Sequence, residues 1–214
     1  MIPTSSHIDN VIASIEAAEN DGPAADPGNG VLDGLSGSKT VGLLQRLAAL
    51  FQDEPDTCYL EIGVFQGLTL LSVAKYLPSL PCFGIDNFSI LDPNGENLGV
   101  VEDRMRRLDA KNAILINEDF ETALENLDQR LGGRKVGVFI VDGAHDYRSQ
   151  LIALLLIGRH LHENAVIIVD DANYEFVRRS TRDFLMGHPE FKLLFEAYSP
   201  DHPANMSPET LAAW

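Results

Sequence analysis

The chain has 214 residues, 45% of them hydrophobic, which favours one domain with a single core because the length is short for two. Its 16 basic and 32 acidic residues give a net charge of −16, and such a field repels phosphate backbones and anionic lipid surfaces. The composition therefore argues against nucleic acids and membranes as partners.

The two cysteines, Cys58 and Cys82, each lie beside an apolar run and have no metal-ligand spacing. We expect both to be reduced core residues, as is typical of a cytoplasmic protein. The N-terminal stretch MIPTSSHIDN lacks a basic region followed by an apolar one, and the sequence has no run of about 18 apolar residues. We therefore expect a soluble cytoplasmic protein without an export signal.

The N-terminal part of the chain predicts an appendage. An amphipathic helix is predicted over residues 6–19, and the Gly-, Pro- and Asp-rich stretch after it predicts a loop to about residue 38. A second helix is predicted to begin at Ser38 or Thr40. We place the boundary of the main domain, residues 39–214, at that point. The first helix is expected either to cover the pocket or to form a contact in a homo-oligomer.

Short apolar runs alternate with helical patterns through the rest of the chain. Each run predicts a strand buried on both faces. Repeated strand, helix, strand units predict an α/β fold, a Rossmann-like doubly wound and mostly parallel sheet with helices on both faces. The strands are predicted over residues 58–64, 82–88, 113–119, 136–143 and 165–172, with a sixth at 191–198, and the helices between them over 68–77, 99–110, 120–131 and 147–161.

Acidic residues end four of the five predicted parallel strands. The carboxyl ends of such strands line the ligand crevice of this fold. One acid there is explained by capping of the next helix, whereas four sets at one rim suggest a site. They are Asp86, Glu118 with Asp119, Asp142, and Asp170 with Asp171, and Glu61 lies inside the first strand.

The stretch LEIGVFQGLTLLS, residues 60–72, predicts a strand, a turn and a helix start. Gly63 and Gly67 allow the backbone to approach a ligand, although an ordinary tight turn explains them equally well. The dinucleotide fingerprint G-x-G-x-x-G is broken by Phe65 and Leu68, which disfavours a nicotinamide dehydrogenase. Asp86, nineteen residues after Gly67, is placed to bind a ribose diol. The combination suits a nucleoside without phosphates.

Three carboxylates follow the fourth and fifth predicted strands and can reach one point: Asp142, Asp170 and Asp171. Oxygen ligands suit Mg²⁺ or Mn²⁺, whereas Zn²⁺ favours histidine or cysteine. His145, three residues after Asp142, is placed as a general base or beside the metal. Helix capping by Asp142 or Asp170, and a solvated His145, are the alternatives.

Four segments in this order resemble class I S-adenosylmethionine-dependent methyltransferases: EIGVFQGLT, GIDNF, DGAHDY and VDDAN. The last two narrow the resemblance to the branch with metal-dependent sugar and macrolide O-methyltransferases and relatives called cephalosporin hydroxylases. The similarity covers about residues 39–200. It implies S-adenosylmethionine and Mg²⁺ or Mn²⁺ as cofactors, and O-methylation of a hydroxyl on a small molecule such as a sugar or secondary metabolite.

The resemblance also implies roles for individual residues. It places the methionine part of the cofactor at Glu61, Gly63, Gly67 and Thr69, the ribose at Asp86 with Asn87, and the adenine at Asp119 and Phe120, with Asp142 also beside the cofactor. It implies Asp142, Asp170 and Asp171 as metal ligands. His145, with Asp142, is implied as the catalytic residue that removes the proton of the acceptor hydroxyl.

The sequence departs from the family pattern at its C-terminal end. Class I methyltransferases have seven strands, and no seventh strand is evident after residue 198. Two alternatives to the leading hypothesis stay open: a hydroxylase-like metal enzyme, although the motifs do not assemble a two-histidine, one-carboxylate triad, and a non-catalytic cofactor-binding module. Tyr147 is expected in the core or pocket wall, His160 and His162 at the surface or in the core, and residues 89–99 in a loop over the substrate or a solvated connector.

Overall fold

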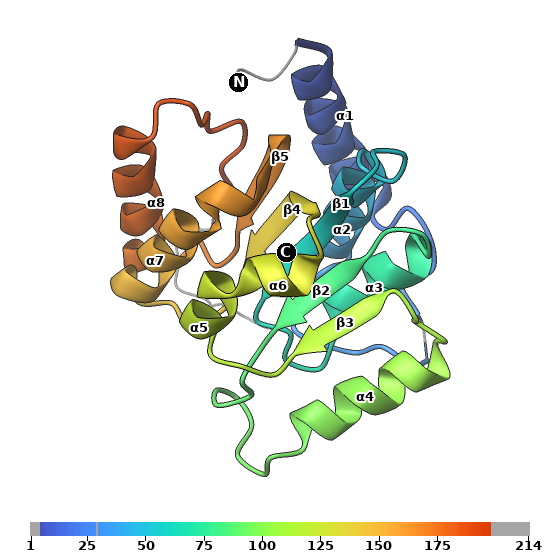
Figure 1. Ribbon diagram of the computed structural model, residues 1–214. Coiled ribbons are helices and arrows are strands. Elements are labelled where there is room, and N and C mark those ends of the chain that lie inside the picture. The colour runs from blue at the N-terminus through green and yellow to red at the C-terminus, as the bar shows by residue number, and fades with distance from the viewer. Residues whose placement is uncertain (1–4, 29, 198–214) are drawn as a thin grey trace.

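The computed structural model describes residues 5–28 and 30–197. Its centre is a five-stranded, wholly parallel sheet in the order β3-β2-β1-β4-β5 (Figure 1). The prediction of a doubly wound α/β fold is confirmed. The strands are β1 Thr57–Ile62, β2 Cys82–Ile85, β3 Ala113–Ile116, β4 Lys135–Val141 and β5 Leu161–Val169.

Helices cover both faces of the sheet, as predicted, and each set closes its own hydrophobic cluster. One face packs against α1 Ser5–Asp21, α2 Ser38–Ala49, α3 Leu68–Tyr76 and α4 Asn97–Arg107. The other packs against α5 Phe120–Glu125, α6 Leu127–Leu131, α7 Tyr147–Ile157 and α8 Glu175–Gly187, with the short 3₁₀ turn η1 Gly158–His160 after α7. Both faces of the inner strands are thereby removed from water, which explains why these strands read as nearly continuous apolar runs.

Strand β1 illustrates how alternation builds the two clusters. Tyr59 packs among the helices α1 to α4, whereas Cys58, Leu60 and Ile62 pack on the opposite face. Both cysteines of the chain are free and buried, as predicted. Burial raises the pKa of the Cys58 thiol to about 12, so this side chain behaves as a small apolar core group rather than as a nucleophile.

The N-terminal helix α1 is part of the packed structure. It lies against α2, and its Val11 and Ala18 are buried, with Val11 in the same cluster as Leu44 and Leu47 of α2. The domain boundary between residues 38 and 39 stays a prediction. Within the described residues, no helix combines the length and apolar character needed to cross a membrane.

The structure corrects several predicted elements. Helix α8 was not predicted, the predicted helix 120–131 is divided into α5 and α6, and β5 begins at Leu161 instead of residue 165. The predicted sixth strand is wrong over residues 191–197, which form no strand and expose Leu193, Leu194 and Phe195; residue 198 lies outside the described part.

Residues 191–197 pair with no strand, although β5 leaves one edge unpaired in the part of the chain that the structure describes. An apolar run becomes a strand only where the tertiary structure brings its backbone alongside such an edge. The apolar pattern of residues 191–197 alone therefore did not decide their conformation. The expectation that no seventh strand follows concerns residues outside the described part and stays a prediction.

Candidate active site

The predicted acidic rim exists at the carboxyl end of the sheet. Asp86, Asp142 and Asp170 directly follow β2, β4 and β5, and Glu118 and Asp119 come shortly after β3. The strand order turns at β1, which has β2 on one side and β4 on the other. A crevice forms at such a switch point in open α/β sheets.

Gly63 allows β1 and β4 to approach each other closely at this rim. Its φ of +91° is left-handed, and a Cβ atom there would lie 1.7 Å from the carbonyl oxygen of Asp142. No larger residue fits without moving the backbone that carries Asp142. Gly67 is the N-cap of α3. Glycine is favoured there by the left-handed φ of +84° and not by lack of space, because a Cβ atom would meet only side chains.

Asp86 organises the same turn. One of its carboxylate oxygens, Oδ2, accepts hydrogen bonds from the backbone N–H groups of Val64 and Phe65, both at 2.9 Å, and Oδ1 accepts one from Phe88 at 2.7 Å. Three backbone donors thus tie the ends of β1 and β2 together around one acid. Asp86 also lines the crevice, so the structure gives it a scaffolding role beside the ribose-binding role predicted for it.

Glu61 lies below the crevice floor. Its side chain is fully buried and accepts hydrogen bonds from the hydroxyls of Tyr59 at 2.6 Å and Thr69 at 3.1 Å. Burial raises the pKa of Glu61 from 4.5 to about 8, against the opposing effect of these hydrogen bonds. Thr69 lines the crevice and Glu61 does not, so among the described residues the hydrogen bond from Thr69 links Glu61 to the crevice wall.

The residues predicted for the adenine side lie at the start of α5. Asp119 is the N-cap of this helix, and its side chain accepts hydrogen bonds from the backbone N–H groups of Glu121 and Thr122. Helix capping therefore explains the position of this acid. Phe120 and Asn87 line the crevice together with Asp119. Residues 89–91, part of the predicted loop over the substrate, line it as well.

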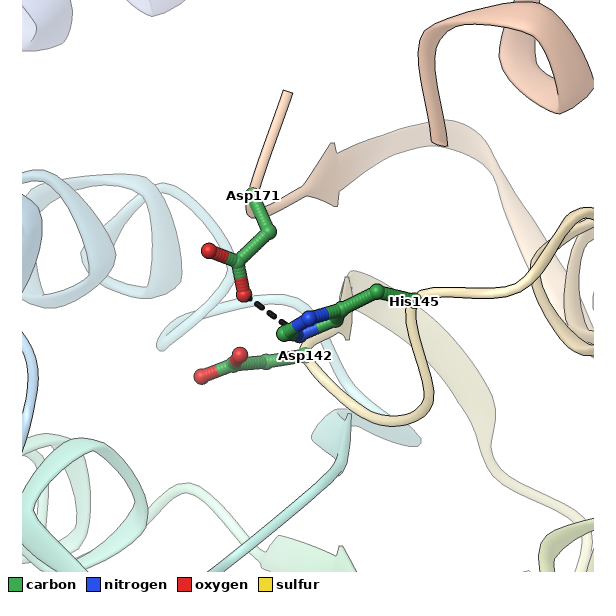
Figure 2. A group of neighbouring side chains, drawn as sticks. All are labelled: Asp142, His145 and Asp171. Carbon is green, nitrogen blue, oxygen red and sulfur yellow. Dashed lines mark ion pairs between the residues drawn. The ribbon is translucent and has the colours of Figure 1, made fainter. Parts of the chain in front are cut away.

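Asp142, His145 and Asp171 form the densest group of titratable side chains at the rim. Figure 2 shows the three side chains pointing toward one another, Asp142 and His145 from the loop after β4 and Asp171 from the loop after β5. His145 Nε2 lies 2.6 Å from Asp171 Oδ2. One potential ligand atom from each residue lies within 4.8 Å of the others, which is the spacing of a metal site.

Like charges and partial burial shift the pKa values within this group. Burial, and then the charges of Asp170 and Asp171, raise the pKa of Asp142 well above its usual range. The hydrogen bond with Asp171 raises the pKa of His145, against the effect of its partial burial. Asp142 is half-buried, and no donor among the described residues hydrogen-bonds to its carboxylate, so the like charges of its neighbours are not offset there by a hydrogen bond.

Asp170 stands slightly apart from this group. It follows β5, its carboxylate accepts a hydrogen bond of 2.8 Å from the backbone N–H of Asp171, and burial raises its pKa. The predicted metal ligands were Asp142, Asp170 and Asp171, whereas the three side chains that converge in the structure include His145 and not Asp170. It offers one histidine and two carboxylates, so within the described residues it is not the two-histidine, one-carboxylate triad of the hydroxylase alternative.

Two residues that sequence reasoning missed support His145. Tyr174 packs its ring against the imidazole, with centroids 4.4 Å apart. Gln150 of α7, which is buried, donates from Nε2 to the carbonyl oxygen of Ala144 at 2.8 Å. Tyr174 directly follows the quoted segment VDDAN, but its role depends on the start of α8, which was not predicted.

The structure corrects the prediction for Tyr147 and decides between the alternatives predicted for His160 and His162. Tyr147 is neither core nor pocket wall: its hydroxyl donates to Asp183 Oδ2 at 2.7 Å and links α7 to α8 at the surface. His160 is a core residue, 1% exposed and 3.1 Å from Asp128. His162 is half-buried and packs edge-on against Phe51.

A single cleft of about 2310 Å³ contains most of the predicted site. Single small-molecule sites enclose about 300–1000 Å³, so the cleft has room for a cofactor and an acceptor together. It extends from the rim along β5 toward α1. Its lining includes the predicted residues Gly63, Thr69, Asp86, Asn87, Asp119, Phe120, Asp142, His145, Asp170 and Asp171, but neither Glu61 nor Gly67.

The fold and the crevice at its switch point define a class I methyltransferase fold. Solved structures of this fold resemble the chain over most of its length at low identity. CalS11, described as a TDP-rhamnose 3'-O-methyltransferase of calicheamicin biosynthesis, has 15% identity and a TM-score of 0.59, with 95% of this chain and 94% of that chain covered.

Two further structures were solved with cofactor. TomG from Streptomyces achromogenes, an O-methyltransferase of tomaymycin synthesis in complex with SAM, has 18% identity and a TM-score of 0.57 over 90% of this chain and 81% of that chain. The O-methyltransferase from Bacillus cereus in complex with SAH has 16% identity and a TM-score of 0.52 over 87% and 80%. No curated protein sequence matches the chain.

The family is shown by the sequence match. The model described as "Methyltransferase domain" matches residues 60–172, more than half of the chain. The protein therefore belongs to this methyltransferase domain family, and the predicted class is confirmed.

Proposed function

We propose that this methyltransferase transfers the methyl group of S-adenosylmethionine to a hydroxyl of a small molecule, with a divalent cation, Mg²⁺ or Mn²⁺, at the rim of the sheet. O-methylation and the cofactor are supported by the solved structures of the same fold described above. A sugar or secondary metabolite is the acceptor class that agrees with the sequence resemblance.

The cofactor is proposed to lie across the switch point. The backbone at Gly63 and the hydroxyl of Thr69 are available to its methionine part, Asp86 and Asn87 to its ribose, and Phe120 to its adenine. Asp86 already fixes this turn through three backbone hydrogen bonds, so the site is preorganised. Because the net charge of the protein is −16, a sulfonium cofactor is also favoured by its sign.

The cation is proposed to be held by Asp142 and Asp171, with Asp170 as a further ligand. One observation carries this step: the half-buried carboxylate of Asp142 lies close to Asp171 and His145, is raised in pKa by the charges of Asp170 and Asp171, and has no hydrogen-bond donor in the described part of the chain. A bound divalent ion supplies the missing positive charge and stabilises an alkoxide. Carboxylates with one nearby imidazole suit Mg²⁺ and Mn²⁺ better than Zn²⁺.

His145 is proposed to accept the proton of the acceptor hydroxyl. Its imidazole lies at the rim, 2.6 Å from Asp171, and about one third of the side chain is exposed to the cleft side where an acceptor enters. Asp171 orients the ring and favours its protonated form. The deprotonated oxygen then attacks the methyl group in line with the sulfonium leaving group, so that the positioning of two bound reactants provides much of the acceleration.

The first experiment is calorimetric titration of the protein with S-adenosylhomocysteine in the presence of Mg²⁺, Mn²⁺ or EDTA. Binding at one-to-one stoichiometry is expected. It is followed by a methyl-transfer assay with a panel of hydroxylated acceptors, in which Asp142→Asn and His145→Gln should lower turnover at least about 100-fold. Glu102→Gln, an exposed site on α4 that does not line the cleft, serves as the control.

Three outcomes would contradict the proposal in different ways. Absence of cofactor binding in a folded sample contradicts the cofactor assignment. Equal turnover with EDTA and with Mg²⁺ or Mn²⁺ contradicts the metal. Cofactor binding with no turnover on any acceptor favours the non-catalytic binding module.

A further inference from the structure

Tyr174 contacts the imidazole of His145, and nothing in the proposed chemistry yet uses it. The two ring centroids lie 4.4 Å apart with the planes tilted by 39°. Asp171, three residues earlier in the chain, contacts the same imidazole at 2.6 Å. One short loop, residues 170–174, therefore provides two contacts to His145.

This loop contains a left-handed residue and is held by hydrogen bonds within the loop and from α8. Asp171 adopts a left-handed conformation with φ +57°, which is uncommon for a residue other than glycine. The backbone N–H of Tyr174 donates to the carbonyl oxygen of Asp171 at 2.9 Å, and the guanidinium of Arg178 donates to the carbonyl oxygen of Ala172. Strained backbone that neighbouring contacts maintain is concentrated at functional sites.

The backbone of Tyr174 is anchored at the start of α8. Tyr174 is the N-cap residue of this helix, with extended backbone, and the helix is anchored by the buried side chains of Val177 and Phe184. The loop after β4 is fixed separately, because Gln150 binds the carbonyl oxygen of Ala144 and Asp146 caps α7. The backbone on both sides of His145 is thus held by α7.

The side chain of His145 is less constrained than its backbone. It is 34% exposed, and Asp171 is 30% exposed, so the ion pair alone stands partly in solvent. A partly exposed pair contributes little orientation, because water competes for both partners. An aromatic ring against the imidazole adds a contact that water does not replace, and it excludes rotamers that turn away from the ring.

We propose that Tyr174 is a positioning residue, whose ring holds the imidazole of His145 toward the acceptor side of the cleft. The inference rests on the proposed function, in which His145 accepts the proton. The ring, and not the hydroxyl, carries the effect. Tyr174→Phe is therefore expected to behave as the wild type, whereas Tyr174→Leu releases the imidazole.

The first arm of the test measures the His145 side chain directly and needs no acceptor. In the full-length protein labelled with ¹³C-histidine, the ring signals of His145 are assigned by their loss in His145→Gln. They should carry the ring-current shift of Tyr174 in the wild type and in Tyr174→Phe. In Tyr174→Leu they should move toward the position of an unstacked histidine. Unchanged His145 signals in Tyr174→Leu would overturn the proposal.

The second arm measures turnover with an acceptor from the panel above. Tyr174→Leu should lower kcat about 10- to 100-fold, because misplacement of a reacting group by about 1 Å has effects of this size. The KM for S-adenosylmethionine should stay unchanged, and Tyr174→Phe should restore kcat. An equal loss in Tyr174→Phe assigns the function to the hydroxyl, and a raised acceptor KM at normal kcat assigns the ring to acceptor binding; either result overturns the proposal.

The two arms separate this inference from the proposed function. If no acceptor is methylated although the NMR contact is present, the proposed function fails and the placement of His145 by Tyr174 stands. Far-UV circular dichroism confirms folding of each variant. If Tyr174→Leu does not fold, Tyr174→Met takes its place as a bulky side chain without a ring.

Discussion

Replacement of Glu61 by glutamine should remove a pH dependence of stability. The folded protein raises the pKa of Glu61 from 4.5 to about 8 because the carboxyl group is fully buried. In the unfolded chain the same carboxyl group keeps the ordinary glutamate pKa of 4.5. Between these two values the folded state binds more protons than the unfolded state, so the free energy of unfolding falls as the pH rises.

The expected magnitude follows from the pKa values. Each unit of pKa difference corresponds to about 1.4 kcal/mol, so the rise from 4.5 to about 8 amounts to at most about 5 kcal/mol lost between these pH values. The contribution of Glu61 is fully present below pH 4 and absent above pH 8. Glu61→Gln keeps a hydrogen-bonding group of the same shape beside Tyr59 and Thr69 without this titration.

The assay is urea unfolding of the two proteins at several pH values from 5 to 8.5, followed by circular dichroism. The difference in unfolding free energy between variant and wild type should grow in favour of glutamine as the pH rises, since the other titrating groups cancel. Glu102→Gln, an exposed site on α4, is the control and should follow the wild type. Parallel curves for Glu61→Gln and the wild type would refute the reasoning.

Three further substitutions test the geometry of the rim. Gly63→Ala forces a Cβ atom to within 1.7 Å of the Asp142 carbonyl oxygen, and thermal unfolding should show a loss of about 3 kcal/mol or more; a loss below about 1 kcal/mol would contradict the close approach. Asp86→Ala removes the acceptor for three backbone N–H groups, so we expect a loss of about 2–4 kcal/mol and cofactor binding weakened at least about tenfold; calorimetry with unchanged affinity would argue against its role. Asp142→Asn relieves like-charge repulsion, so it should stabilise the metal-free protein at pH 7 by about 1–3 kcal/mol and weaken Mn²⁺ binding. A variant that is less stable than the wild type in EDTA would contradict the repulsion.

Local sequence patterns determined the sheet and its acidic rim. Strands buried on both faces must be apolar throughout, so the five parallel strands were visible as runs with helical patterns between them. Asp86, Asp142 and Asp170 mark where these runs end, because a charged group is excluded from the buried layer and tolerated at its edge. The methyltransferase family followed from the order of four such segments.

Patterns at the end of the chain were less informative. The apolar residues 191–197 resemble a strand, but strand formation depends on a partner backbone that a local pattern does not specify. Helix α8 was missed although its sequence shows the pattern. Its buried residues Val177, Ser180 and Phe184 recur at i, i+3 and i+7, which is the amphipathic spacing of a helix that packs on one face, here against α7.

The sequence by itself determined which residues reach the rim, and the tertiary structure decided what each of them contacts. Asp86 and Asp119 lie at the predicted ends of their strands. Their carboxylate oxygens, however, accept hydrogen bonds from backbone N–H groups, and only the folded turns bring these donors into position. The pairing of His145 with Asp171 and the ring of Tyr174 joins two loops more than twenty residues apart in the chain. Contacts of this kind depend on the angle between packed elements, which local propensity does not encode and which the completed core alone fixes.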